Sequence, residues 1–192
     1  GSYHAEQLNT TAPSATAVRN MMLKGRDWAD AIPSSAAKIF DQAPRHTLEA
    51  GERAVIAKLR TMSEDDFAAL PYGSEGLWRK LMKASRNTSD LSSIVNAVKS
   101  KRYTRTRIDR MILCAFLELR QDDFGGEPET IRILAFNDRG RAVLRTQPSF
   151  RNAGDAPSDR EKRFGDLYGI FCIDGIEPPG IEGKRRIYYF KE

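Results

Sequence analysis

A dense run of positive side chains lies between residues 98 and 110 of this 192-residue chain. It contains one acid, Asp109, and six cations, which are Lys99, Lys101, Arg102, Arg105, Arg107 and Arg110. Guanidinium and ammonium groups clustered in this way donate charge-assisted hydrogen bonds to phosphate oxygens. The run therefore predicts a site that binds phosphate groups.

The helices predicted around this run strengthen the interpretation. The first three cations close one helix, where positive charge complements the helix dipole. Arg105 and Arg107 fall in the first turn of the next helix, where the dipole favours negative charge. A bound phosphate would reconcile this placement, because the helix amides and the Thr104 hydroxyl could donate to its oxygens. The alternative is a solvated helix corner, since runs of charge are commonly plain surface.

Tyr103 lies among these cations and offers an aromatic face on which an unpaired base can stack, as single-stranded RNA recognition commonly requires. The alternative is that its ring fills the core. The first interpretation gives seven predicted RNA-binding residues, which are Lys99, Lys101, Arg102, Tyr103, Arg105, Arg107 and Arg110.

A second candidate group occupies a predicted helix start near the amino terminus. Ser14, Thr16 and Arg19 place two hydroxyls and a guanidinium where free backbone amides could gather around the phosphates of a nucleotide. The alternative is ordinary helix capping, because Ser and Thr are common at helix starts.

Other catalytic patterns are absent from the sequence. It contains no H-x-G-H motif, no P-loop and no glycine-rich dinucleotide fingerprint, and its only histidines are His4 and His46. Cys114 and Cys172 both lie among apolar neighbours, so we expect buried, reduced thiols without the partners that a metal site needs. We therefore predict no catalytic residue and no metal site in this chain.

The bulk composition is that of a globular protein with a mild preference for anionic partners. Apolar residues make up 40% of the chain, and 31 basic against 26 acidic residues give a net charge of +5. The longest apolar run, residues 111–117, is far shorter than the roughly eighteen residues of a membrane span. No signal peptide pattern opens the sequence, so we expect a cytoplasmic protein.

Apolar spacing and capping residues predict helices through most of the first 120 residues. The expected helices cover residues 14–30, 33–40, 47–62, a short one from Ser63, 77–86, one capped by Ser89, and 104–119. Beyond them we expect a loop over 121–129, a helix over 139–145, a flexible connection over 147–162, and strands over 131–136, 167–173 and 185–191. The predicted fold is mainly α, a helical bundle-like domain with a small α+β appendage at the carboxy terminus.

Several segments, in this order and at these separations, carry a family resemblance. They are Tyr3-His4, Ser14-Ala-Thr-Ala-Val-Arg19, Glu75-Gly-Leu77, Lys101-Arg-Tyr-Thr-Arg-Thr-Arg107 with Arg110, and Ile131-Arg-Ile-Leu-Ala-Phe-Asn-Asp-Arg-Gly140. Together they resemble the bacterial tRNA(Met) cytidine acetate ligase family, a nucleotidyltransferase-like group. The resemblance covers residues 3–145, with residues 166–168 the only later match.

The resemblance implies an amino-terminal nucleotidyltransferase domain of the H-x-G-H type, followed by a helical domain that engages tRNA. It implies that acetate and ATP form acetyl-adenylate, and that the acetyl group then passes to the wobble cytidine of elongator tRNA(Met). Ser14, Thr16 and Arg19 match the second nucleotidyltransferase signature and would steady the ATP phosphates. The basic run matches the motif that would hold tRNA.

The resemblance also implies a domain organisation. Residues 1–32 would be the end of the nucleotidyltransferase-like domain, 33–120 the helical tRNA-binding domain, and 121–192 the appendage. Because the H-x-G-H motif is absent, we expect a carboxy-terminal part that is inactive without the missing amino-terminal catalytic half. Two alternatives stay open, a non-catalytic RNA-binding module and an adenylyltransferase that acts on a small molecule.

Overall fold

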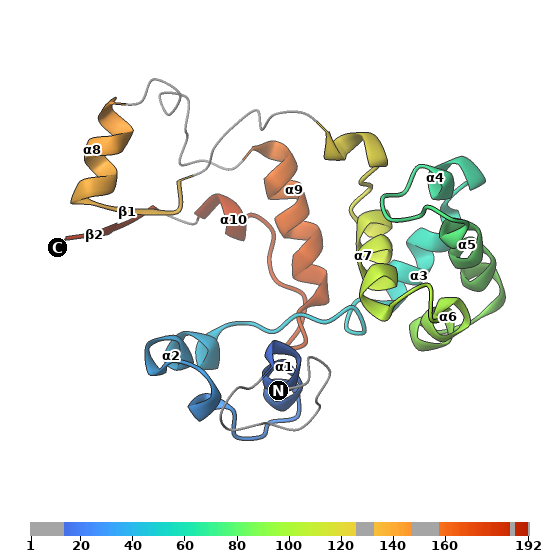
Figure 1. The fold of residues 1–192 in the computed structure, drawn as a ribbon, viewed down its shortest axis with the longest axis horizontal. Coiled ribbons are helices and arrows are strands. Elements are labelled where there is room, and N and C mark those ends of the chain that lie inside the picture. The colour runs from blue at the N-terminus through green and yellow to red at the C-terminus, as the bar shows by residue number, and fades with distance from the viewer. Residues whose placement is uncertain (1–13, 126–132, 147–157, 185–186, 192) are drawn as a thin grey trace. The chain divides into compact units, whose positions relative to one another are not determined.

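The computed structural model describes residues 14–125, 133–146, 158–184 and 187–191 (Figure 1). Its contacts divide the chain into two compact units, residues 1–45 and 46–192. Residues 33–45, which the sequence assigns to the helical domain, thus belong to the same unit as the first helix.

The first unit contains two α-helices and a 3-10 turn in its described part. These are α1 (Ala15–Leu23), η1 (Ala29–Ala31) and α2 (Ser34–Gln42). The expected cap of α1 is confirmed, because the Ser14 hydroxyl accepts a hydrogen bond from the Ala17 amide at 3.1 Å. The expected continuation of α1 to about residue 30 is wrong. Gly25 adopts a left-handed φ of 62°, a conformation that ends helices and favours glycine.

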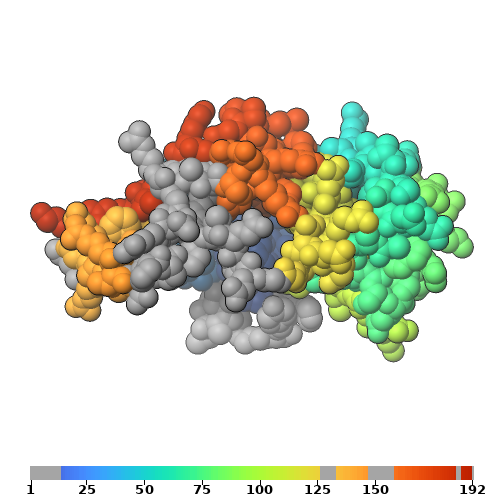
Figure 2. Space-filling view, turned by 90° about the horizontal axis from the view of Figure 1, so that it is seen from above, coloured from blue at the N-terminus to red at the C-terminus, as the bar shows by residue number. Residues whose placement is uncertain are grey.

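The second unit is built around five consecutive helices. They are α3 (Glu52–Thr61), α4 (Glu64–Ala68), α5 (Leu77–Asn87), α6 (Leu91–Val98) and α7 (Arg105–Phe116). α5 contacts α3, α4 and α6, and α7 packs against α3 and α6. In the space-filling view their atoms form one continuous mass, from cyan through green to yellow (Figure 2). The core inside it consists of aliphatic and aromatic side chains, from Val55 at its start to Phe116.

Local capping explains where three of these helices, α4, α6 and α7, begin. Ser63 and Asp66 form the expected capping box of α4, and the Thr104 hydroxyl accepts from the Arg107 amide at the start of α7, also as expected. The expected Ser89 cap of α6 is wrong by one residue. The Asp90 carboxylate accepts the Ser93 amide at 2.8 Å instead, and Asp is as good a helix cap as Ser.

The carboxy-terminal part of the second unit is more helical than expected. It contains η2 (Gln121–Phe124), β1 (Ala135–Asn137), α8 (Asp138–Thr146), α9 (Asp159–Tyr168), η4 (Gly169–Phe171), α10 (Ile181–Lys184) and β2 (Tyr188–Phe190). The helix expected over residues 139–145 is confirmed as α8, whereas the loop expected from residue 121 begins as η2. Residues 131–132, 147–157 and 185–186 of the other expected segments lie outside the described residues.

Two expectations for this part are wrong. Residues 158–162 are not a flexible connection but include the start of α9, which Ser158 and Glu161 cap reciprocally. Residues 167–173 are not a strand but the end of α9 and η4, because Leu167, Ile170 and Phe171 follow helical spacing rather than alternation. All three side chains pack on the helical core, and Phe171 is 1% exposed within it.

The strands expected over 131–136 and 185–191 are confirmed in their described parts but are short. β1 and β2 form a two-stranded parallel sheet in which Ala135 pairs with Tyr188 and Asn137 with Phe190. These three-residue strands are the only ones within the described ranges. The mainly α fold class is therefore confirmed. Among the helices described, none is both long and apolar enough to cross a membrane.

The contact between Gly51 and Phe171 ties the carboxy-terminal part to the helical core, and it can be tested. A methyl group on Gly51 would overlap the Phe171 ring, so Gly51→Ala should destabilise the protein by about 1–3 kcal/mol through overpacking. Gly183→Ala is the matched control, because a methyl group there meets nothing within 4 Å. Urea unfolding measures both, and equal stabilities would contradict the contact.

Candidate nucleic-acid interface

The turn between α6 and α7 is fixed by Tyr103. Its ring is 4% exposed in the core, and its hydroxyl donates to the Glu75 carbonyl oxygen at 2.5 Å. The Ser100 carbonyl and hydroxyl oxygens both accept from the Tyr103 amide, at 3.2 Å each, which closes the turn. The structure therefore shows the alternative for Tyr103, a ring that fills the core, and not the exposed stacking face that the RNA-binding interpretation expected.

Arg107 holds the loop before α5. Its guanidinium donates to the Tyr72 carbonyl at 3.0 Å, and to the hydroxyl and carbonyl of Ser74 at 2.8 and 3.3 Å. Tyr72 and Glu75 in this loop have left-handed φ values of 65° and 62°. Such backbone costs on the order of 1–3 kcal/mol for a residue other than glycine. The hydrogen bonds from Arg107 and Tyr103 offset that cost, so these two side chains are part of the fold.

The Glu75 carboxylate lies between two of the predicted RNA-binding arginines. It pairs with the Arg102 guanidinium at 3.1 Å and with that of Arg107 at 3.3 Å. Hydrogen bonds from Arg102 first, and then from Arg107, hold the pKa of the Glu75 carboxyl below its ordinary value. The two guanidinium groups thus share one carboxylate, although exposed pairs of this kind add little stability.

Arg105 is neutralised in the same way by two acids. Its guanidinium donates to both carboxylate oxygens of Asp109, at 2.7 and 2.9 Å, and to Glu49 at 3.0 Å. The cations in the first turn of α7 are therefore balanced by carboxylates that the chain itself supplies. A bound phosphate is therefore not needed to reconcile their position with the helix dipole. Glu49 and Glu75 are remote in sequence, so the sequence alone could not assign them to this turn.

Three cations of the run have no partner among the residues that the structure describes. Lys99, Lys101 and Arg110 are exposed, and in the part of the chain that the structure describes no hydrogen bond or ion pair involves their side chains. Arg102 is also accessible, with 64% of its side chain exposed beside Glu75. These groups can meet a polyanion without first breaking a buried contact, so they form the accessible part of the predicted phosphate site.

The amino-terminal group lies on α1 in the first unit. Thr16 and Arg19 are exposed, while Ser14 caps the helix and keeps its hydroxyl hydrogen available to donate. Arg19 also lines a hollow of about 370 Å³ whose other walls are mainly apolar, among them Val18 and Phe40. A cation and a hydroxyl beside an apolar hollow are groups that a nucleotide could use.

Sequence reasoning missed one cluster of polar side chains. His46 and Cys172 form an isolated antiparallel bridge, and His46 Nε2 lies 2.9 Å from Glu177 Oε2. These two side chains and the Cys172 thiol offer three possible metal ligands within 4.8 Å of one another. The expectation that Cys172 lacks such neighbours is therefore wrong, because the bridge joins residues that are far apart in sequence. Both cysteines are buried, as expected.

The Tyr103 hydroxyl gives a direct test of the turn. Tyr103→Phe removes the hydrogen bond to the Glu75 carbonyl and should destabilise the protein by about 1 kcal/mol, with the ring still in the core. Tyr72→Phe is the matched control, because the Tyr72 side chain is 39% exposed and should tolerate the change within about 0.5 kcal/mol. Chemical denaturation compares them, and an unchanged Tyr103→Phe stability would contradict the role of the hydroxyl.

Comparison with known proteins identifies the family to which this chain is similar. A family model described as HIGH Nucleotidyl Transferase matches residues 1–152. A tRNA(Met) cytidine acetate ligase of Kosmotoga olearia is 32% identical over 220 residues, covering 93% of this chain and 51% of that protein. The ligase of Alkaliphilus metalliredigens is 30% identical over 157 residues, covering 74% and 37% respectively. The chain thus spans between about a third and a half of these curated relatives.

Solved structures agree on the fold. The apo structure of Thermotoga maritima TmcAL matches with a TM-score of 0.78 at 21% identity, over 100% of this chain and 54% of that one. A structure of TmcAL bound with alpha-thio ATP matches with a TM-score of 0.76 at 22% identity, over 96% and 53%. The family match includes α1 and the basic run, although no H-x-G-H motif occurs among the 192 residues. With 152 of its 192 residues matched, the chain belongs to the HIGH nucleotidyl transferase family.

Proposed function

We propose that this chain is the tRNA-engaging part of an ATP-dependent tRNA(Met) cytidine acetate ligase. The observation that carries the proposal is a group of exposed cations without an ion-pair partner among the described residues. They are Lys99 and Lys101 at the turn, where Arg102 is also accessible, and Arg110 in α7. Relatives named tRNA(Met) cytidine acetate ligase, which match 74% and 93% of this chain, support it. A turn with this charge suits the phosphate backbone of a structured RNA.

In the proposed reaction the intact enzyme first joins acetate to ATP. A carboxylate oxygen of acetate attacks the α-phosphate, which gives acetyl-adenylate and releases pyrophosphate. The exocyclic amine of the wobble cytidine in elongator tRNA(Met) then attacks the acetyl carbonyl, which forms the amide and releases AMP. The first step requires ATP to be held in place, and the second requires acetyl-adenylate and the tRNA to be held together.

The residues of this chain would bind rather than react. The basic turn, which is the part of the basic run that links α6 to α7, would hold tRNA phosphates. Ser14, Thr16 and Arg19 on α1 would donate to the phosphates of ATP, which is the co-substrate. An amino-terminal half with the H-x-G-H motif would supply acetate activation, so this chain by itself would not form acetyl-adenylate. The proposed setting is the cytoplasm.

The experiment is a measurement of elongator tRNA(Met) binding to this chain at several salt concentrations. Lys99→Ala/Lys101→Ala/Arg110→Ala should weaken binding and lower the magnitude of the salt slope by roughly 0.7–0.9 for each lost phosphate contact. Arg107 is left unchanged, because it holds the loop before α5. The charge-matched control changes three other exposed cations, Arg145, Lys184 and Lys191, and should retain the slope.

The outcomes separate the possible functions. If the wild-type chain binds no tRNA, its tRNA-engaging role is wrong, and an adenylyltransferase acting on a small molecule becomes the better account. If both triple variants weaken binding equally, only net charge matters and the basic turn is a solvated corner. If the chain binds tRNA but the intact protein uses no ATP, a non-catalytic RNA-binding module replaces the ligase.

A further inference from the structure

One face of α5 carries four cations that the sequence motif does not include. Arg79, Lys80, Lys83 and Arg86 recur at helical spacing and are all exposed, while the opposite face packs into the core. The helix contains no acidic residue. Its last cation, Arg86, suits the negative end of the helix dipole, but Arg79 and Lys80 lie near the positive end.

Aromatic rings position these first two cations. The Arg79 guanidinium lies 4.7 Å from the Trp78 ring centroid, and the Lys80 ammonium lies 5.1 Å from that of Tyr103. A cation–π contact orients a cation and contributes about 0.5–1 kcal/mol at an exposed site, but it supplies no compensating negative charge. Both groups are exposed and keep their positive charge.

The four cations Arg79, Lys80, Lys83 and Arg86 form a stripe on α5, which differs from the basic turn in its ion pairing. Arg102, Arg105 and Arg107 are matched by Glu75, Asp109 and Glu49. Among the described residues, no carboxylate lies within ion-pair distance of any of the four α5 cations. Much of the unbalanced positive charge on this face of the second unit therefore comes from α5.

The stripe and the basic turn are adjacent. Lys80 of α5 and the guanidinium groups of Arg102 and Arg107 all lie within 6 Å of the Tyr103 ring centroid. From Arg79 to Arg86 the helix rises about 10 Å, at about 1.5 Å for each residue. Since one strand of a double helix carries a charge about every 3.4 Å along the axis, this length can face about three phosphates.

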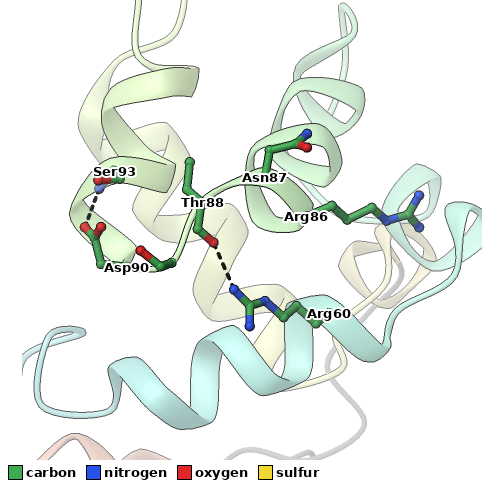
Figure 3. A pocket seen from close by; sticks show the side chains of 7 residues that line it. Arg60, Arg86, Asn87, Thr88, Asp90 and Ser93 are labelled. Carbon is green, nitrogen blue, oxygen red and sulfur yellow. Dashed lines mark hydrogen bonds between the residues drawn. The ribbon is translucent and has the colours of Figure 1, made fainter.

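The far end of the stripe opens on a polar hollow of about 470 Å³ (Figure 3). Arg60 of α3 reaches across it and donates to the Thr88 carbonyl at 3.0 Å, while the Asp90 carboxylate is held by the Ser93 amide. Arg86 extends from the end of α5 away from Thr88 (Figure 3), and among the described residues its side chain has no hydrogen bond or ion pair. Its guanidinium is therefore available to a ligand.

We infer that the exposed face of α5 is a second RNA-backbone contact, which continues the basic turn and lengthens its track of phosphates. The inference rests on the proposed function, because the partner is the same tRNA. Lys83 and Arg86 are the decisive residues, since among the described residues no hydrogen bond, ion pair or cation–π contact involves either side chain. They bind phosphate oxygens without regard to base sequence.

The test compares Lys83→Ala/Arg86→Ala with a charge-matched control, Arg145→Ala/Lys184→Ala, in tRNA binding by the chain across a salt series. The α5 variant should weaken binding roughly tenfold or more near 0.1 M salt and lower the salt slope by about 1.5, whereas the control should not. Urea midpoints for both variants verify that the fold is retained. Because the α5 cations contact phosphates and not bases, added RNA of unrelated sequence should compete with tRNA for them.

The outcomes separate this inference from the proposed function. If the triple variant at the turn weakens binding and the α5 variant matches its control, the stripe is only a solvated face. The inference about α5 is then overturned, and the proposed function is not. If the wild-type chain binds no tRNA, both are overturned. If the triple variant at the turn and the α5 variant both lower the salt slope, while both controls retain it, the continuous track is supported.

Discussion

The structure depends on the contact between the start of α7 and the loop before α5. Tyr103 donates to the Glu75 carbonyl and Arg107 donates to Tyr72 and Ser74, which holds two non-glycine residues in left-handed backbone. Each such residue costs on the order of 1–3 kcal/mol, so the loop needs partners of this strength. The same contact brings α5 beside the turn between α6 and α7, and it thereby places two groups of cations next to each other.

This contact also divides the cations of the basic run into two classes. Arg105 and Arg107 serve the fold, because their guanidinium groups bind carboxylates and carbonyls of the chain itself. Lys99, Lys101 and the α5 cations have no such partners in the described residues, so their charge acts on whatever approaches the surface. A dense basic motif can thus contain some cations that stabilise the fold and others that are available to a ligand. The number of its cations overstates how many are available to bind phosphate.

The sequence predicts features that local chemistry determines and misses those set by distant residues. Ser63 and Thr104 cap their helices as expected, and apolar spacing places most helices between residues 47 and 119. Asp109, a local partner, supplies one of the carboxylates that neutralise the first turn of α7, but the other two come from Glu49 and Glu75, which no local pattern connects to it. The pairing of His46 with Cys172 and the burial of Phe171 likewise arise from tertiary contacts, so an apolar helix end resembled a strand.

The central claim is that the cations at the turn and on α5 without partners among the described residues face tRNA. It can be tested on the protein without any substitution. Lysine acetylation by a small reagent, followed by mass spectrometry with and without elongator tRNA(Met), reports the accessibility of each ammonium group. We predict that tRNA protects Lys83, Lys99 and Lys101, and leaves Lys58, paired with Glu118, and Lys184 unchanged. Uniform protection of all lysines, or protection of Lys58 and Lys184 alone, would contradict the account.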